Sequence, residues 1–260
     1  AGCAAERAYC LAKLAEKKGD YIGASNEYEN AGDIFEDDNL ELSNKSRRES
    51  IRCSEIAMKA PLNNDEEYEL LMRISRLLNV LGDKASSGKI NAQAEELRAR
   101  RATDPKVRKN GLNRAAIKFR DAGEESESAR LFIDCQDYLN AAKLYCKLDN
   151  HRKFQSSMAR CFVNKKMNEN AAHLYSPIKE SKTIWKDDAA NLLNVDISEI
   201  PNINNANLDE AIKLAPNGSE LHDKLKLEQI KGRGNWKTEA KLYEKQNKFD
   251  KAFELFEKHI

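Results

Sequence analysis

The sequence lacks any long apolar run. No stretch of about 18 apolar residues, roughly the length that a helix needs to cross a membrane, occurs among its 260 residues. The first residues also lack the basic region followed by an apolar one that marks a secretory signal. We therefore expect a protein that is not inserted into a membrane and that shows no targeting signal.

Metal-ligand spacing is missing as well. The four histidines are scattered, and no two of the six cysteines form a CxxC pair. The cysteines stand at Cys3, Cys10, Cys53, Cys135, Cys146 and Cys161. We interpret them as small hydrophobic side chains in a reducing compartment. We therefore expect a cytoplasmic protein, with the nucleus as the alternative, that holds no metal and no cofactor.

Neither sign of charge dominates the sequence. Lys and Arg number 44 and Asp and Glu number 43, so no net field draws the whole chain to nucleic acid or to an anionic membrane. Charged residues make up 33% of the sequence, which favours many exposed helix faces over one compact core. A charged partner would therefore need a local patch.

Proline and alternating β-branched residues are scarce, which argues against β structure. The five prolines fall between stretches with apolar residues at helical spacing, so these stretches are predicted to be helices separated by turns. The predicted fold class is all-α. The predicted helices span 3–18, 21–36, 41–60, 64–81, 84–101, 106–121, 124–134, 137–148, 151–164, 168–176, 183–194, 207–215, 219–232, 236–246 and 249–259.

A short repeat runs through the chain. Aromatic residues recur mostly 13 residues apart, at Phe119, Phe132, Tyr145, Phe162, Tyr175, Tyr243 and Phe256. Such a step accommodates one helix and one tight turn. Four residues before most of these rings lies a small residue, such as Ala141 before Tyr145 in QDYLNAAKLYCKL (136–148). An i, i+4 pair lies on one helix face, so we interpret the small residue as admitting a neighbouring helix, with no ligand involved.

One stretch resembles a known repeat. In GDYIGASNEYENA (19–31) the glycine, aromatic and alanine residues have the spacing of the turn and second helix of a tetratricopeptide repeat (TPR), although Glu36 replaces the closing proline. Residues 136–148 and 247–259 resemble the same half-repeat, with steps far shorter than the family's usual ~34 residues. The chain thus resembles TPR-like helical solenoids, including SNAP-type vesicle-fusion adaptors. The resemblance implies a right-handed α-solenoid of antiparallel helix hairpins.

Two styles of helix are expected within this solenoid. Residues 1–105 are predicted to hold long TPR/SNAP-like helices, and residues 106–260 shorter TPR-like ones, in one continuous solenoid that we expect to be part of a larger protein. An irregular insertion is predicted near 176–207, with a surface loop over 195–207. Trp185 is predicted to cap the neighbouring core rather than to anchor a partner.

No recognisable catalytic pattern occurs. Cys161 and His173 are twelve residues apart on neighbouring predicted helices, which we interpret as a chance pairing within a repeat. The glycines of 85–89 and 231–236 do not have the spacing of a phosphate-binding loop. We predict that the protein is not an enzyme and assign no catalytic residue.

Charge is nevertheless uneven along the chain. Residues 33–41 carry acidic side chains and no basic one, whereas residues 98–114 carry basic side chains against Asp104 alone. If the basic side chains converged on one surface, they could meet an acidic partner or several phosphates; spread over helix ends, they would only keep the chain soluble. The residues predicted to bind a partner are Arg98, Arg100, Arg101, Lys106, Arg108 and Lys109.

The predicted function is a non-enzymatic scaffold or adaptor segment that binds a protein or peptide within a larger assembly. A solenoid exposes a long face suited to peptide recognition, and the TPR resemblance points to Arg7, Lys13, Asn26 and Asn30 as groove residues. The alternative is a nucleic-acid-associated accessory helical region of a helicase-like protein. It is less favoured because residues 98–118 contain no aromatic side chain on which a base could stack.

Overall fold

The computed structural model describes residues 2–178, 180–203 and 206–259. Every regular element in these ranges is a helix, and none is a strand, which confirms the predicted all-α fold class. The chain divides into two compact units, which we call unit 1 (up to Gln136) and unit 2 (from Asp137). The predicted division of helix styles at residue 105 remains a prediction.

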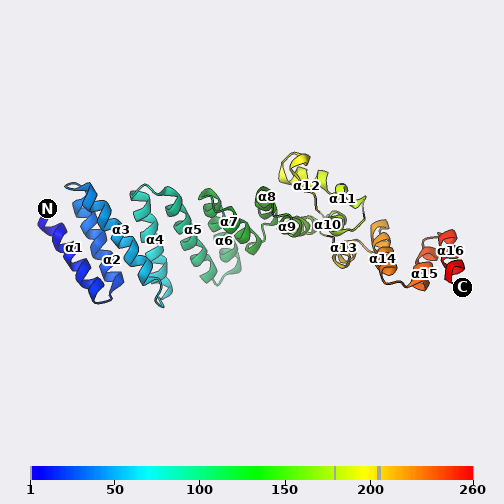
Figure 1. Ribbon diagram of the computed structural model, residues 1–260, viewed down its shortest axis with the longest axis horizontal. Coiled ribbons are helices and arrows are strands. Elements are labelled where there is room, and N and C mark those ends of the chain that lie inside the picture. The colour runs from blue at the N-terminus through cyan, green and yellow to red at the C-terminus, as the bar shows by residue number, and fades with distance from the viewer. Residues whose placement is uncertain (1, 179, 204–205, 260) are drawn as a thin grey trace. The chain divides into compact units, whose positions relative to one another are not determined.

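Unit 1 consists of long helices of 15–18 residues and the shorter α7, which follow one another, each packed against the next (Figure 1). Its helices are α1 (Gly2–Lys17), α2 (Tyr21–Phe35), α3 (Leu40–Ala57), α4 (Asn64–Val80), α5 (Lys84–Arg101), α6 (Pro105–Asp121) and α7 (Glu125–Asp134). Most of these boundaries lie within one or two residues of those predicted.

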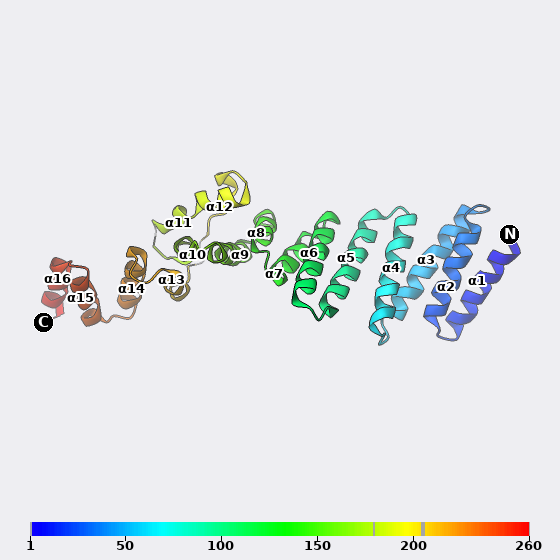
Figure 2. The same cartoon turned by 180° about the vertical axis from the view of Figure 1, so that it is seen from behind.

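Unit 2 consists of shorter helices, seen from the opposite side in Figure 2. Its helices are α8 (Tyr138–Lys147), α9 (His151–Asn164), α10 (Asn168–Tyr175), α11 (Ser181–Ile184), α12 (Lys186–Leu193), the 3₁₀ turn η1 (Ile197–Glu199), α13 (Leu208–Leu214), α14 (Glu220–Gly232), α15 (Trp236–Lys245) and α16 (Phe249–His259). The prediction of a single helix over 183–194 is wrong. Two separate helices, α11 and α12, meet at Trp185 instead.

One turn geometry recurs between consecutive helices. A residue in the left-handed region ends the first helix, and the N–H of the next residue donates to a carbonyl five residues back, as Glu124 does to Phe119 at 2.8 Å. The left-handed residues of this turn include Gly19, Gly82, Gly123, Asp149, Lys166, Gly234 and Asn247. The residue after each usually caps the following helix, as Asp20 does by accepting the Gly23 N–H at 2.8 Å. This two-residue turn explains how a helix and its connection fit into 13 residues.

Small residues are buried at the repeated positions of the helices. Ala24, Ala115, Ser128, Ala141 and Ala171 are all fully buried, as predicted for the position four residues before a ring. A close approach of two helices explains Gly111 in α6, where an added Cβ would lie 2.6 Å from the Cβ of Ala99 in α5. The repeated residues are therefore packing residues.

Buried serines perform the same task between α2 and α3. Ser50 donates from its hydroxyl to the carbonyl oxygen of Ser25 at 2.8 Å, and Ser43 donates to the carbonyl oxygen of Gly32 at 2.7 Å. A serine side chain is small enough for close helix packing, and these hydrogen bonds satisfy its hydroxyl in a buried position. The α2–α3 contact is thus both tight and polar.

The described part of 176–207 packs against α9 within unit 2. Trp185 is 1% exposed, and its ring centroid lies 6.3 Å from that of Phe154 in α9, which confirms its predicted place in the core. Residues 195–207 were predicted as a surface loop, yet they contain η1 and the buried Ile200, which is 3% exposed. Residues 204–205 lie outside the described ranges. The local reason for η1 is a capping box between Asp196 and Glu199.

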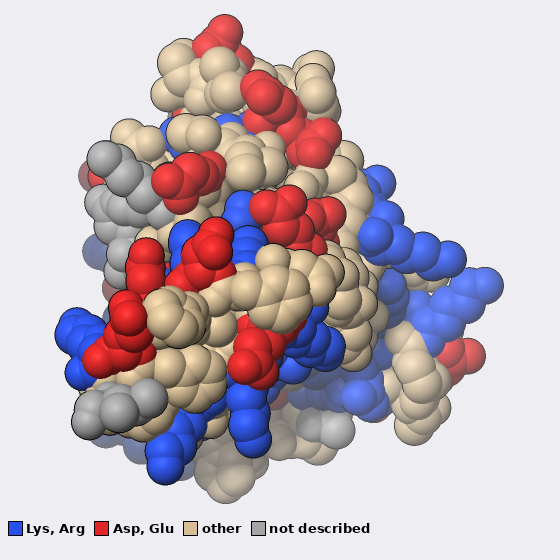
Figure 3. Space-filling model, turned by 90° about the vertical axis from the view of Figure 1, so that its right-hand side faces the viewer, with Lys and Arg blue, Asp and Glu red and all other residues tan. Residues whose placement is uncertain are grey.

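Charged side chains of both signs cover the helices. On the face drawn in Figure 3, Lys and Arg side chains lie beside Asp and Glu side chains, as expected from their nearly equal numbers. Within the described ranges, no helix has the length and apolar content that crossing a membrane requires.

The left-handed turn residue Lys166 provides a test of the turn geometry. Lys166 is exposed and has φ of 61°, a conformation that glycine adopts without a steric penalty. We expect Lys166→Gly to raise the free energy of unfolding by about 0.5–1 kcal/mol in urea titrations. Lys166→Ala is the control and should change it little, because alanine keeps the Cβ. A glycine variant no more stable than the alanine variant would contradict this turn geometry.

Ala141 tests the packing role of the small residues. Ala141→Leu should destabilise the protein by about 1–3 kcal/mol, because Ala141 is fully buried and a larger side chain would overpack its surroundings. The same substitution at the exposed Ala4 controls for the change in side-chain type and should have little effect. Unchanged stability of Ala141→Leu, measured by urea unfolding, would be incompatible with close packing at this residue.

Candidate protein-interaction site

The basic residues predicted to bind a partner lie at the end of α5 and the start of α6. Arg100 pairs with Glu96 and Asp134, each at 2.8 Å, and Arg101 pairs with Glu67 at 3.0 Å. Arg108 donates to the carbonyl oxygen of Ala102. Half of the predicted set is thus engaged within unit 1.

The other three side chains of that set are exposed. Arg98, Lys106 and Lys109 make no side-chain hydrogen bond or ion pair with any residue that the structure describes. Fewer basic side chains are therefore free at the α5–α6 connection than the sequence suggests. Arg98, Lys106 and Lys109 do not line any of the recesses described below.

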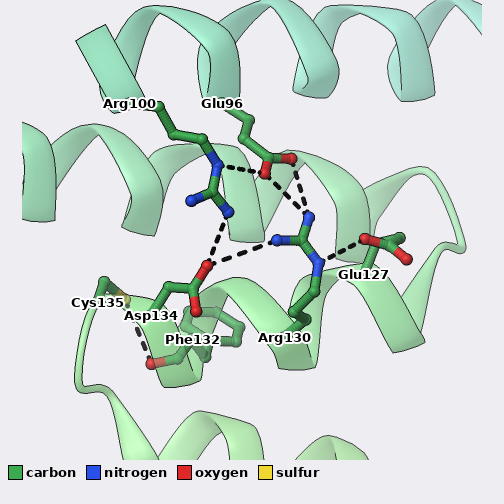
Figure 4. Close-up of polar contacts among 7 residues, drawn as sticks. All are labelled: Glu96, Arg100, Glu127, Arg130, Phe132, Asp134 and Cys135. Atoms are coloured by element: carbon green, nitrogen blue, oxygen red, sulfur yellow. Dashed lines mark hydrogen bonds and ion pairs between the residues drawn. The ribbon is translucent and has the colours of Figure 1, made fainter. Parts of the chain in front are cut away.

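Figure 4 shows the ion-pair network that holds Arg100. Glu96 of α5 accepts from Arg100 of its own helix and from Arg130 of α7 at 3.0 Å. Arg130 also pairs with Glu127 at 2.8 Å, and Asp134 accepts from Arg100. The network joins α5 directly to α7, so it links two helices that are separated in the chain by α6.

Similar pairs join other helices of unit 1 that are two apart in the chain. Glu16 of α1 pairs with Arg52 of α3 at 2.5 Å. Glu29 of α2 pairs with Arg73 of α4 at 3.1 Å and with Arg76 of the same helix. Arg52, Arg73 and Arg76 therefore stabilise the order of the helices, and their charges are not free to bind a partner.

A recess of about 470 Å³ lies between α2, α3 and α4 in unit 1. We call it the α2–α4 groove. Its lining residues are Asn26, Glu29, Asn30, Asp33, Arg47, Arg76, Leu77 and Val80. Two of them, Asn26 and Asn30, are among the four residues that the TPR resemblance indicates.

Charges in the α2–α4 groove are compensated within unit 1. Arg47 is 3% exposed and donates to Asp33 at 3.2 Å and to Glu36 at 2.6 Å. Burial alone would lower the pKa of Arg47, but the hydrogen bonds to Glu36 and Asp33 outweigh it and raise the pKa. Arg47 is therefore held in its charged form beside these two carboxylates.

Free hydrogen-bonding groups remain on the α2 wall of the groove. Asn26 and Asn30 are exposed, and neither side chain bonds to any residue in the described ranges. They are four residues apart, which places them one turn apart on the same helix face. Val80 adds exposed apolar surface on the α4 side.

The other two residues that the resemblance indicates lie elsewhere. Lys13 of α1 lies over the rings of Tyr9 and Tyr28, at 5.9 and 5.6 Å from their centroids. Arg7 is exposed on α1 and does not line the groove. The structure therefore brings together Asn26 and Asn30 but not the full set.

Metal-ligating side chains do not cluster in the described ranges. No group of three or more His, Cys, Asp or Glu side chains there could hold a metal ion. Burial raises the pKa of the Cys161 thiol and lowers the pKa of His173, so both side chains favour the neutral form. A neutral, buried thiol is a poor nucleophile.

One basic stretch was missed at the sequence level. Residues 138–168 contain Asp149 as their only acidic residue, and their basic residues are Lys143, Lys147, Arg152, Lys153, Arg160, Lys165 and Lys166. The stretch equals 98–114 in number of basic residues, but these are spread over more positions. Counting charge over a whole helix pair would have found it.

No protein-family model matches the sequence, and no curated protein matches it either.

The network of Figure 4 can be tested with a double-mutant cycle on Glu96 and Arg130. For Glu96→Gln and Arg130→Met we expect a coupling energy of about 0.5–1.5 kcal/mol, because Glu96 is largely shielded from water and the pair joins two helices. The coupling should fall when the urea titrations are repeated in about 1 M NaCl.

The exposed pair Arg120–Asp121 serves as a control within unit 1. Its two members are neighbours in the chain, so breaking it should give a coupling energy near zero. Equal coupling for both pairs would mean that the α5–α7 network does not stabilise the helix order.

Proposed function

We propose that the protein is a non-enzymatic scaffold or adaptor that binds another protein within a larger assembly. In this proposal its helices form a TPR-like, right-handed solenoid of antiparallel hairpins. The observation that carries it is the α2–α4 groove, in which charged groups pair with each other while two asparagine amides stay unpaired on one helix face. Such a recess suits recognition of a polypeptide more than chemistry on a small substrate.

Asn26 and Asn30 would bind the main chain of the partner. A primary amide carries both a donor and an acceptor, so each can pair with one peptide group of an extended segment. Val80, which is exposed, would contact an apolar side chain of the same segment. Because the nearby charges are compensated, recognition here would depend on hydrogen bonds and shape more than on long-range attraction.

A nucleic-acid-associated role, as in a helicase-like protein, ranks second. It would depend on Arg98, Lys106 and Lys109, since the remaining members of the basic set are engaged in ion pairs or with the backbone. Three lysines and arginines neutralise few phosphates, and no aromatic side chain lies among residues 98–118 to stack on a base.

Peptide selection tests the proposed function directly. Random 12-residue peptides displayed on phage would be selected against the full chain, and the enriched peptides measured by fluorescence anisotropy. We expect the double variant Asn26→Ala/Asn30→Ala to weaken their binding about tenfold or more, because two or more hydrogen bonds are lost. Asn110→Ala, at an exposed asparagine of α6, should leave binding unchanged.

Two results would contradict the proposal. The selection could enrich no peptide, or the enriched peptides could bind the double variant as tightly as the unaltered chain. Urea unfolding of each variant, expected to be unchanged because both asparagines are exposed, separates loss of binding from loss of structure.

A further inference from the structure

Unit 2 contains a second recess, which follows α9 and has different chemistry. Two adjoining hollows of about 490 and 290 Å³ share Ser156 and Tyr175, and we call them together the α9 groove. Arg152, Ser156 and Arg160 lie on one face of α9 at four-residue spacing. The far wall is made by Asn207, Glu210 and Leu214 at the start and along the length of α13.

The two arginines of the α9 groove have no carboxylate partner. Arg152 and Arg160 are exposed, and neither forms an ion pair with any described residue; Arg160 only lies over the Tyr138 ring, 5.4 Å from its centroid. This contrasts with Arg47 and Arg130 of unit 1, which each pair with two carboxylates or more. The α9 groove therefore presents unneutralised positive charge inside a recess.

The surroundings of the groove strengthen this charge. Lys165 and Lys166 are exposed at the end of α9, and Asp149, before its start, contacts His151 at 2.7 Å. Glu210 is the one carboxylate among the lining residues, and it pairs with Lys213 at 3.5 Å. An anionic partner would therefore meet little repulsion.

The spacing of the two arginines selects the shape of the partner. Eight residues of α-helix separate Arg152 from Arg160, which places their Cα atoms about 12 Å apart along the helix axis. In an extended peptide, residues i and i+4 point to the same side and are about 13 Å apart. Two carboxylates four residues apart could thus each meet one arginine, and Val163 and Leu214 offer apolar contact beyond Arg160.

The rings in the groove are poorly placed to hold nucleic acid. One face of Tyr138 is covered by Arg160. Tyr175 is partly buried, and its hydroxyl interacts with the side chain of Ser156. Recognition of single strands depends on open ring faces on which successive bases can stack, and the Tyr138 face under Arg160 is not open in this way.

We propose that the α9 groove binds an extended acidic peptide whose two carboxylate side chains stand four residues apart. Arg152 and Arg160 each donate to one carboxylate, and the peptide lies along α9 over about three turns. The partner surface of unit 2 is thus distinct from the α2–α4 groove and does not depend on it.

Synthetic peptides of defined spacing test this proposal on the full chain. The probes are fluorescein-labelled 12-residue peptides made of Gly, Ser and Thr with two glutamates. The glutamates stand at i and i+n, with n from 1 to 6 in different peptides, and one leucine follows the second glutamate. At about 50 mM salt we expect the peptide with glutamates at i and i+4 to bind tightest. Arg152→Gln/Arg160→Gln should weaken its binding about tenfold or more, as expected for loss of charge-assisted hydrogen bonds.

Three controls make the outcome decisive. Arg233→Gln, at another exposed arginine of unit 2, should leave binding unchanged, and so should Asn26→Ala/Asn30→Ala in unit 1. Circular dichroism checks that the variants keep their helices. The proposal is overturned if no peptide binds or if binding is the same for every spacing. It is also overturned if a 12-nucleotide uridine RNA binds tighter than the peptides and Arg152→Gln/Arg160→Gln abolishes that binding.

Discussion

Close approach of consecutive helices at small buried side chains is the constraint on which the structure depends. Ala24, Ala115, Ala141 and Ala171 leave no Cγ between the helices, so the rings one turn later can fill the space beside them. Gly111 shows the limit of this approach, because even a methyl group there would collide with Ala99. The aromatic positions and the short turns follow from this packing, since a helix displaced outward would lose contact with its neighbours.

Ion pairs add a second level of order in unit 1. The small residues bring consecutive helices together, and pairs such as Glu96–Arg130 and Glu16–Arg52 join helices two apart. A charged residue engaged in this way contributes little to recognition of a partner. This explains why many of the arginines of unit 1 are not free, whereas Arg152 and Arg160 of the α9 groove form no ion pair with a described residue.

The two grooves differ in the forces that they offer. The α2–α4 groove has paired charges and free amides, and suits hydrogen bonding to a main chain. The α9 groove has free arginines and little acidic surface, and suits an anionic side chain. The two grooves thus differ in chemistry, and each is lined by residues of one unit only.

The sequence by itself determined the helices and the packing residues, because both depend on local rules. Cap residues such as Asp20, glycines such as Gly123 and the i, i+4 pairing of small residue and ring act within one or two turns of the chain. The break at Trp185 and the burial of Ile200 escaped prediction, because both result from packing against the rest of unit 2.

Only the tertiary structure decided which charged groups are free. Arg100 and Lys109 look alike in sequence, yet Arg100 is held by Glu96 and Asp134, and the second of these is 34 positions away. Arg152 and Arg160 gave no sequence signal beyond a diffuse basic stretch, and they became a candidate site because α13 and Tyr175 enclose them in a recess. Ion pairing and enclosure join residues far apart in the chain, so they follow from the packing of helices and not from any local pattern.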